Sequence, residues 1–138
     1  METLPSDDLT VALGGPGVLA ERMGITLTEA APERVVGTMP VEANTQPYGL
    51  LHGGASCVLA ETLGSIGAAM HAARVNGGIA VGVDISATHH RGARSGLVTG
   101  VATPLHLGGS IATYEIVVSD EAGRRLCTAR LTCALRRT

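Results

Sequence analysis

Hydrophobic residues recur along this chain at two different spacings, and the change from one to the other marks its elements. Residues 46–68 begin as a loop, in which Pro47 and Gly49 interrupt regular structure. Beyond the loop, apolar residues recur every three or four positions, at Leu59, Leu63, Ile66 and Met70. This spacing predicts a helix with one apolar stripe, which ends near Ala73, before the sequence Asn-Gly-Gly.

Six other segments have the pattern and the bounding turns of β-strands. They cover residues 25–30, 34–39, 79–91, 97–105, 110–119 and 124–135. In residues 79–91 the alternation predicts one face made of Val81, Val83, Ile85 and Ala87. In the last strand it predicts an apolar face made of Cys127, Ala129, Leu131, Cys133 and Leu135. A short helix over residues 16–23 is expected before the first strand.

The order of these elements predicts an α+β fold. Two strands, one long helix and an antiparallel run are satisfied by a single helix laid against a curved antiparallel sheet. The length of 138 residues suits one domain. We expect this domain to span residues 15–138, after a mobile N-terminal segment over residues 1–14.

Composition narrows the class of protein. The chain is 45% hydrophobic and 16% charged, as globular proteins are, and its net charge of −2 gives no reason to expect nucleic acid as a partner. No apolar stretch has the length of a membrane span, and the acidic N-terminus lacks the features of a signal peptide. The three cysteines match no zinc spacing. Together these features predict a cytoplasmic location.

The start of the long helix is a candidate site for carbonyl activation. His52, Gly53 and Gly54 precede the periodic segment, without Ser, Thr, Asp or Asn at the usual cap position. The first N–H groups of a helix lack intrahelical partners and lie at the positive end of its dipole. The Gly53 N–H is therefore a candidate donor to a developing oxyanion.

Glu61 is the second candidate group, because it is the sole acid in the helix. The residues on its side of the helix are all small, which predicts room for a ligand or another chain; they are Cys57, Gly64, Ser65, Ala68 and Ala72. Glu61 lies roughly 12 Å along the helix from Gly53. This distance is too long for both groups to touch one substrate carbon within a single chain. If they act on the same carbon, a symmetry-related subunit must supply one of them.

The whole segment resembles the active-site segment of hotdog-fold acyl-CoA thioesterases, in the phenylacetate-degradation and 4-hydroxybenzoyl-CoA thioesterase branch. The residues that fit are Gln46, Pro47, Gly49, His52, Gly53, Gly54, Glu61, Gly64 and Ser65. The similarity continues through DISATHHR (84–91) and TPLHLG (103–108) and covers the chain from about Met23 onward. It implies a hotdog fold and the hydrolysis of an acyl-CoA thioester, often with an aromatic acyl group.

The resemblance also implies roles for individual residues. The Gly53 N–H polarises the thioester carbonyl, and Gln46 contacts the thioester or the attacking water. Glu61 acts as general base or as nucleophile through an anhydride, and its burial in the helix would suit it to acid–base work. His52 lies at the edge of the site, and Ser65, one turn after Glu61, positions that carboxylate or the water.

Two further segments are candidates for binding coenzyme A. His89, His90, Arg91 and Arg94 form a basic cluster that suits phosphates. In the second segment, turn N–H groups are expected to form an anion nest; it contains His106, Gly108, Gly109 and Ser110. Coenzyme A is part of the substrate, and we expect no separate cofactor and no metal.

Two other functions fit parts of the pattern. One is a hotdog hydratase or dehydratase that acts on hydroxyacyl thioesters, and the other is a non-catalytic acyl-CoA-binding module. Relatives are built as homo-oligomers, so the resemblance implies a dimer or a dimer of dimers, with sites at the dimer interface. The acyl-CoA substrate is the expected partner, and neither nucleic acid nor membrane is expected.

Overall fold

The computed structural model describes residues 16–137, so the N-terminal segment expected to be mobile lies outside the described residues. The order of elements is the expected one, and their ends fall within two residues of the predicted ends. They are α2 (Val18–Met23), β1 (Thr26–Ala31), β2 (Arg34–Pro40), α3 (Gly53–Val75), β3 (Ile79–His89), β4 (Leu97–Leu107), β5 (Ile111–Ser119) and β6 (Arg125–Arg136).

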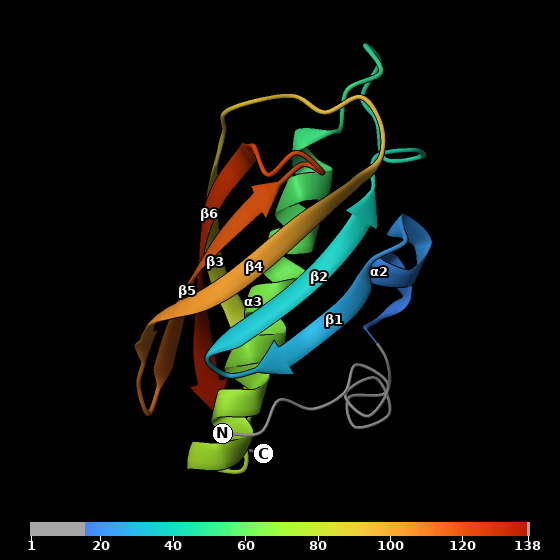
Figure 1. The fold of residues 1–138 in the computed structure, drawn as a ribbon. Helices are drawn as coiled ribbons and strands as arrows, with labels where there is room; N and C mark the ends of the chain where they lie inside the picture. Colours follow the sequence, from blue (N-terminus) through green and yellow to red (C-terminus); the bar gives the residue numbers. More distant parts are fainter. Residues whose placement is uncertain (1–15, 138) are drawn as a thin grey trace.

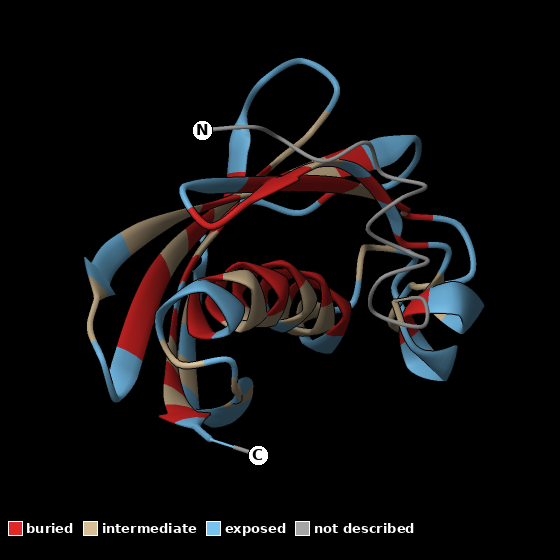
Figure 2. Ribbon diagram, turned by 90° about the horizontal axis from the view of Figure 1, so that it is seen from below, coloured by how far each residue is buried: buried red, intermediate tan, exposed pale blue. Residues whose placement is uncertain are grey.

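The six strands form one antiparallel sheet in the order β1-β2-β4-β5-β6-β3. Helix α3 crosses the concave face of this sheet (Figure 1). Seen along the helix, the sheet curves around it (Figure 2), and buried residues of β1, β2, β4, β5 and β6 make the core with α3, whereas β3 has no buried residue. The fold is thus the predicted α+β arrangement, a hotdog fold with one wrapped helix, and β1 and β3 are its edge strands.

Small residues let the sheet approach α3 closely. A Cβ atom added at Gly64 would lie 2.7 Å from Leu131 Cδ2, and one added at Gly67 would lie 2.7 Å from Tyr114 Cζ. The predicted apolar stripe faces the core, with Leu59 and Leu63 fully buried. The interpretation of the small-residue face was wrong in part: Gly64, Ala68 and Ala72 are covered by the chain's own sheet.

Strand β3 departs from the predicted alternation. Its pairing with β6 shifts register between Gly82 and Asp84, so Val83 is an extra residue. Val81 and Val83 are 45% and 62% exposed, whereas Ile85 and Ala87 pack against the core. The prediction of one continuous face was therefore wrong, because an inserted residue reverses the alternation. The predicted apolar face of β6 is confirmed, since its five residues are buried.

Within residues 16–137, the helices are too short or too polar to cross a membrane.

Candidate active site

The loop that precedes α3 is held in place by backbone hydrogen bonds to neighbouring segments. The His52 N–H donates to the Asn44 carbonyl at 2.9 Å, and the Leu51 N–H donates to the Ala93 carbonyl at 2.8 Å. The His52 Nδ1 accepts the Gly54 N–H at 2.8 Å, so this imidazole is the helix cap. A histidine thus takes the place of the Ser, Thr, Asp or Asn that is missing from the usual cap position.

The cap leaves Gly53 as the open donor. The N–H groups of Ala55 and Ser56 donate to the His52 carbonyl, at 2.9 and 3.3 Å, and that of Gly54 donates to the imidazole. Among residues 16–137, the Gly53 N–H has no hydrogen-bond partner. Because it lies at the positive end of a 23-residue helix, it is suited to stabilise negative charge on a carbonyl oxygen.

The Gln46 side-chain amide is oriented by two backbone hydrogen bonds. Its Oε1 accepts the backbone N–H groups of Tyr48 and Leu50, which settles the orientation of the amide. Within the part of the chain that the structure describes, the amide NH₂ group has no partner, so it is available as a hydrogen-bond donor. Gln46 and Gly53 line one cavity of about 410 Å³.

The same cavity contains most of the predicted basic cluster. His89, His90 and Arg91 line it together with Ser56. The His89 ring lies over Gly53, since a Cβ atom added at Gly53 would be 3.0 Å from His89 Nε2. His90 Nε2 lies 2.9 Å from Thr128 Oγ1. Basic side chains thus gather at the open end of α3, next to the Gly53 N–H.

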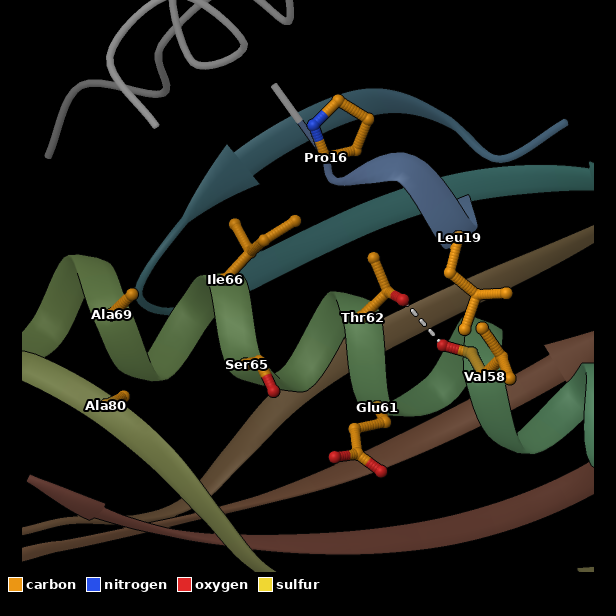
Figure 3. Close-up of a pocket in the computed structure, with 9 residues that line it drawn as sticks. All are labelled: Pro16, Leu19, Val58, Glu61, Thr62, Ser65, Ile66, Ala69 and Ala80. Carbon is orange, nitrogen blue, oxygen red and sulfur yellow. Dashed lines mark hydrogen bonds between the residues drawn. The ribbon is translucent and has the colours of Figure 1, made fainter. Parts of the chain in front are cut away.

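Glu61 lies in a different cavity, of about 520 Å³ (Figure 3). Its walls are mostly apolar and include Leu19, Val58, Ile66 and Ala80. The Glu61 side chain is exposed in the single chain, so the expected burial was wrong. Glu61 does not share a cavity with Gly53 or Gln46, as the distance along the helix predicts.

The hydroxyl groups near Glu61 have other partners in this chain. Thr62 Oγ1 donates to the Val58 carbonyl at 2.6 Å (Figure 3), and the Ser65 hydroxyl interacts with the Cys133 thiol. Burial raises the pKa of the Cys133 thiol; the Ser65 hydrogen bond opposes this shift, and the charge of Glu61 adds to it. The Cys133 thiol and Gly82, whose Cβ position lies 3.0 Å from Glu61 Oε2, are neighbours of Glu61 that sequence reasoning missed.

The remaining predicted coenzyme A residues lie elsewhere. Arg94 lines a third cavity, of about 450 Å³, with Asp120 and Arg124. The turn between β4 and β5 lies at the far end of α3, where His71 Nε2 bonds to the Gly108 carbonyl at 2.7 Å. One chain therefore does not bring His106, Gly108, Gly109 and Ser110 to the basic cluster.

The Gly108 N–H is also occupied, because it donates to the Ile111 carbonyl at 2.9 Å. It therefore cannot contribute to the predicted anion nest in this arrangement. Across residues 16–137, no three His, Cys, Asp or Glu side chains lie close enough together to hold a metal ion.

Comparison with known proteins identifies the family. The sequence model of the thioesterase superfamily matches residues 48–127, a range that contains Gly53, Glu61, His89 and Arg91. This chain belongs to the thioesterase superfamily. It is 49% identical to the proofreading thioesterase EntH of Cronobacter sakazakii over 120 residues, which are 86% of each chain.

Solved structures agree with this assignment. A thioesterase from Haemophilus influenzae matches with a TM-score of 0.87 and 34% identity, covering 99% of this chain and 93% of the other. A variant of a thioesterase from Pseudomonas aeruginosa matches with a TM-score of 0.85 and 37% identity, covering 96% and 94%. The chain is a thioester hydrolase with a hotdog fold. The hydratase and the non-catalytic module receive no support from these thioesterases.

Proposed function

We propose that this thioesterase hydrolyses acyl-CoA thioesters with aromatic acyl groups, at a site shared by two subunits. The observation that carries the proposal is the separation of two complementary half-sites. One half-site has open donors, the Gly53 N–H and the Gln46 amide. The other has the carboxylate of Glu61 beside a mostly apolar cavity. Each half lacks what the other holds.

The free edge of β3 supports the pairing of two chains. β3 ends the sheet, and three of its hydrophobic side chains are exposed: Ile79, Val81 and Val83. An exposed hydrophobic edge strand favours pairing with another strand. A two-fold dimer formed along this edge would be isologous and would create two equal sites. Each would combine Glu61 of one chain with Gly53 and Gln46 of the other.

In the proposed reaction, the thioester carbonyl oxygen accepts hydrogen bonds from the Gly53 N–H and the Gln46 amide. These donors stabilise the negative charge that develops on that oxygen. Glu61 either removes a proton from the water that attacks the carbonyl carbon or attacks it directly, forming an anhydride that water then cleaves. In both routes the C–S bond breaks, the thiolate takes up a proton, and the acid is released.

The substrate proposal rests on the surroundings of each half-site. The basic side chains of His89, His90 and Arg91 surround the donor half, and they suit the phosphates of coenzyme A. The cavity beside Glu61 is lined by Leu19, Val58 and other apolar groups, and it suits a flat acyl group.

Variants of a related protein lend support to the two chosen residues. Two solved structures of one Staphylococcus aureus thioesterase, each 31% identical to this chain, carry alanine in place of a glutamate and of a glutamine. In that protein the two positions are 15 residues apart, as Gln46 and Glu61 are here.

Mixing subunits tests the shared site. Glu61→Ala and Gln46→Ala are each expected to be nearly inactive, and they are refolded together in equal amounts. Random mixing makes about half of the dimers mixed, and each mixed dimer has one doubly altered site and one intact site. About a quarter of all sites should then release thiol from benzoyl-CoA. No recovery, with mixed dimers confirmed by mass, would show that each site lies within one chain.

The acyl preference is tested separately with the wild-type protein. We expect kcat/KM for thiol release to be higher with benzoyl-CoA than with hexanoyl-CoA. A higher value for the aliphatic ester would overturn the aromatic assignment and leave the shared site untouched.

A further inference from the structure

Strand β3 faces α3 with residues from both sides of its bulge. Gly82 and His89 are seven positions apart, and in a regular strand they would point to opposite faces. Val83 is the extra residue between them, and because it reverses the alternation, Gly82 and His89 lie on the same face. Both positions therefore face α3: the Cβ position of Gly82 lies 3.0 Å from Glu61 Oε2, and the His89 Nε2 lies 3.0 Å from the Cβ position of Gly53.

The contact at Gly82 is confined to one side chain. Within 4 Å of a Cβ atom added at Gly82, the structure places only Glu61 Oε2, at 3.0 Å, and Glu61 Cδ, at 4.0 Å. Other glycines around α3 behave differently, since an added Cβ at Gly64 or Gly100 would meet a leucine of the core at 2.7 Å. A methyl group at position 82 would thus meet the Glu61 carboxylate and nothing of the core.

We propose that Gly82 is a positioning residue for the Glu61 carboxylate. This inference rests on the role proposed above for Glu61. Because glycine has no side chain, position 82 leaves space in which the Glu61 carboxylate lies against β3. The bulge at Val83 turns Gly82 toward the helix. In this proposal Gly82 does not contact the substrate, and it affects the reaction only through the position of the Glu61 carboxylate.

Adding a methyl group at position 82 should displace the carboxylate rather than the fold. A separation of 3.0 Å is tighter than an ordinary contact between a Cβ atom and an oxygen, so the exposed Glu61 side chain must shift by a few tenths of an ångström. Because a misplacement of about 1 Å can cost a catalytic group on the order of 10²-fold in rate, a shift of a few tenths of an ångström should cost several-fold. The Gly82→Ala substitution should therefore lower kcat, with little change in Tm.

The test is Gly82→Ala in the full chain, with thiol release from benzoyl-CoA as the readout. We expect kcat to fall about 3- to 10-fold, with KM within about 2-fold and Tm unchanged. Ser86→Ala is the matched control, because it removes a polar atom from the exposed face of the same strand. The control should keep the wild-type kcat.

A double-mutant cycle with Glu61→Asp separates positioning from a general structural effect. Aspartate is one methylene shorter and does not reach the added methyl group. Gly82→Ala should then lower kcat by less than about 2-fold in the Glu61→Asp background. If Gly82→Ala lowers kcat equally in both backgrounds, Gly82 acts independently of Glu61, and the inference is wrong.

The remaining outcomes are also decisive. If Gly82→Ala keeps the wild-type kcat while Glu61→Gln is strongly impaired, the inference fails and the role of Glu61 stands. If Glu61→Gln is fully active, the proposed mechanism fails, and the inference fails with it. If Gly82→Ala instead lowers Tm, Gly82→Ala should leave Tm unchanged in the Glu61→Ala background. A decrease in Tm that persists in that background contradicts the inference.

Discussion

The imidazole of His52 accepts the N–H of Gly54 at 2.8 Å and thereby closes the start of α3 next to an open Gly53 N–H. Because the acceptor is Nδ1, the proton of the neutral ring lies on Nε2. The side chain thus does the work of the Asn or Asp that usually caps a helix. This bond gives His52 a role in the geometry of the site that does not require contact with substrate.

We predict that His52→Ala destabilises the protein by about 1 kcal/mol, the typical cost of losing a helix cap. It should also lower kcat, because the segment that presents the Gly53 N–H becomes less ordered. His52→Asn restores a capping oxygen and should recover most of both losses. Urea unfolding and thiol-release kinetics provide the measurements. Equal impairment in both variants would instead indicate that the imidazole itself contacts the substrate.

Glu61→Gln should lower kcat by about 10²- to 10⁴-fold, the usual contribution of a positioned acid–base group. The amide keeps the shape of the side chain but neither accepts the proton of water nor attacks a carbonyl. Steady-state thiol release, with Tm as a check on folding, measures the effect. Glu21→Gln removes an exposed acid of α2 and serves as the control. Near-wild-type kcat in a folded Glu61→Gln protein would exclude Glu61 from the mechanism.

Arg91→Ala should raise KM for acyl-CoA more than it lowers kcat. Arg91 lines the cavity of Gly53 and His89, and a phosphate contact contributes equally to the bound ground state and the transition state. Adding His89→Ala should raise KM further. Arg22→Ala, on the exposed surface of α2, is the control. An unchanged KM for coenzyme A esters would place the phosphate contact elsewhere.

Gly67→Ala should destabilise the fold by about 1–3 kcal/mol, the usual cost of overpacking a core. The added methyl group would lie 2.7 Å from Tyr114 Cζ, and Tyr114 is fully buried with its hydroxyl bonded to the Pro32 carbonyl. The ring therefore has little freedom to move. Gly109→Ala adds a methyl group with no neighbour within 4 Å and should leave the free energy of unfolding nearly unchanged. Equal stability of the two variants would contradict the packing described here.

Stability should fall at alkaline pH. Burial raises the pKa values of Cys127 and Cys133 above the ordinary thiol value of 9.0, and that of Tyr114 above 10.0. Above pH 9 the unfolded chain therefore ionises before the native protein does. The free energy of unfolding should be unaffected by these groups below pH 9 and should decline as pH rises beyond it.

Urea unfolding between pH 7.5 and 10.5 measures this decline. Each thiol contributes at most about 1.4 kcal/mol per pH unit. Cys127→Ala should reduce the slope, and Tyr114→Phe should reduce it only at pH values above 10. A stability that rises with pH over this range would contradict the stated direction of the shifts.

The sequence alone determined the order of elements, because helical and strand spacings are local properties. The patterns also predicted the buried faces of α3 and β6 correctly, at Leu59 and Leu63 and at the alternating residues of β6. Each pattern is continuous along its own segment. The spacing of Gly53 and Glu61 along one helix was equally local. It predicted that the two groups do not meet within one chain.

Only the tertiary structure decided the face that β3 presents to α3. The bulge at Val83 depends on pairing with β6, some fifty residues away, and no local signal marks the inserted residue. The exposure of Glu61 and the hydrogen bond from the Gly54 N–H to the His52 imidazole likewise depend on atoms that folding brings together. Local spacing specifies which residues share an element, whereas strand register and side-chain contacts between elements are long-range, and these place Gly82 against Glu61 and His89 over Gly53.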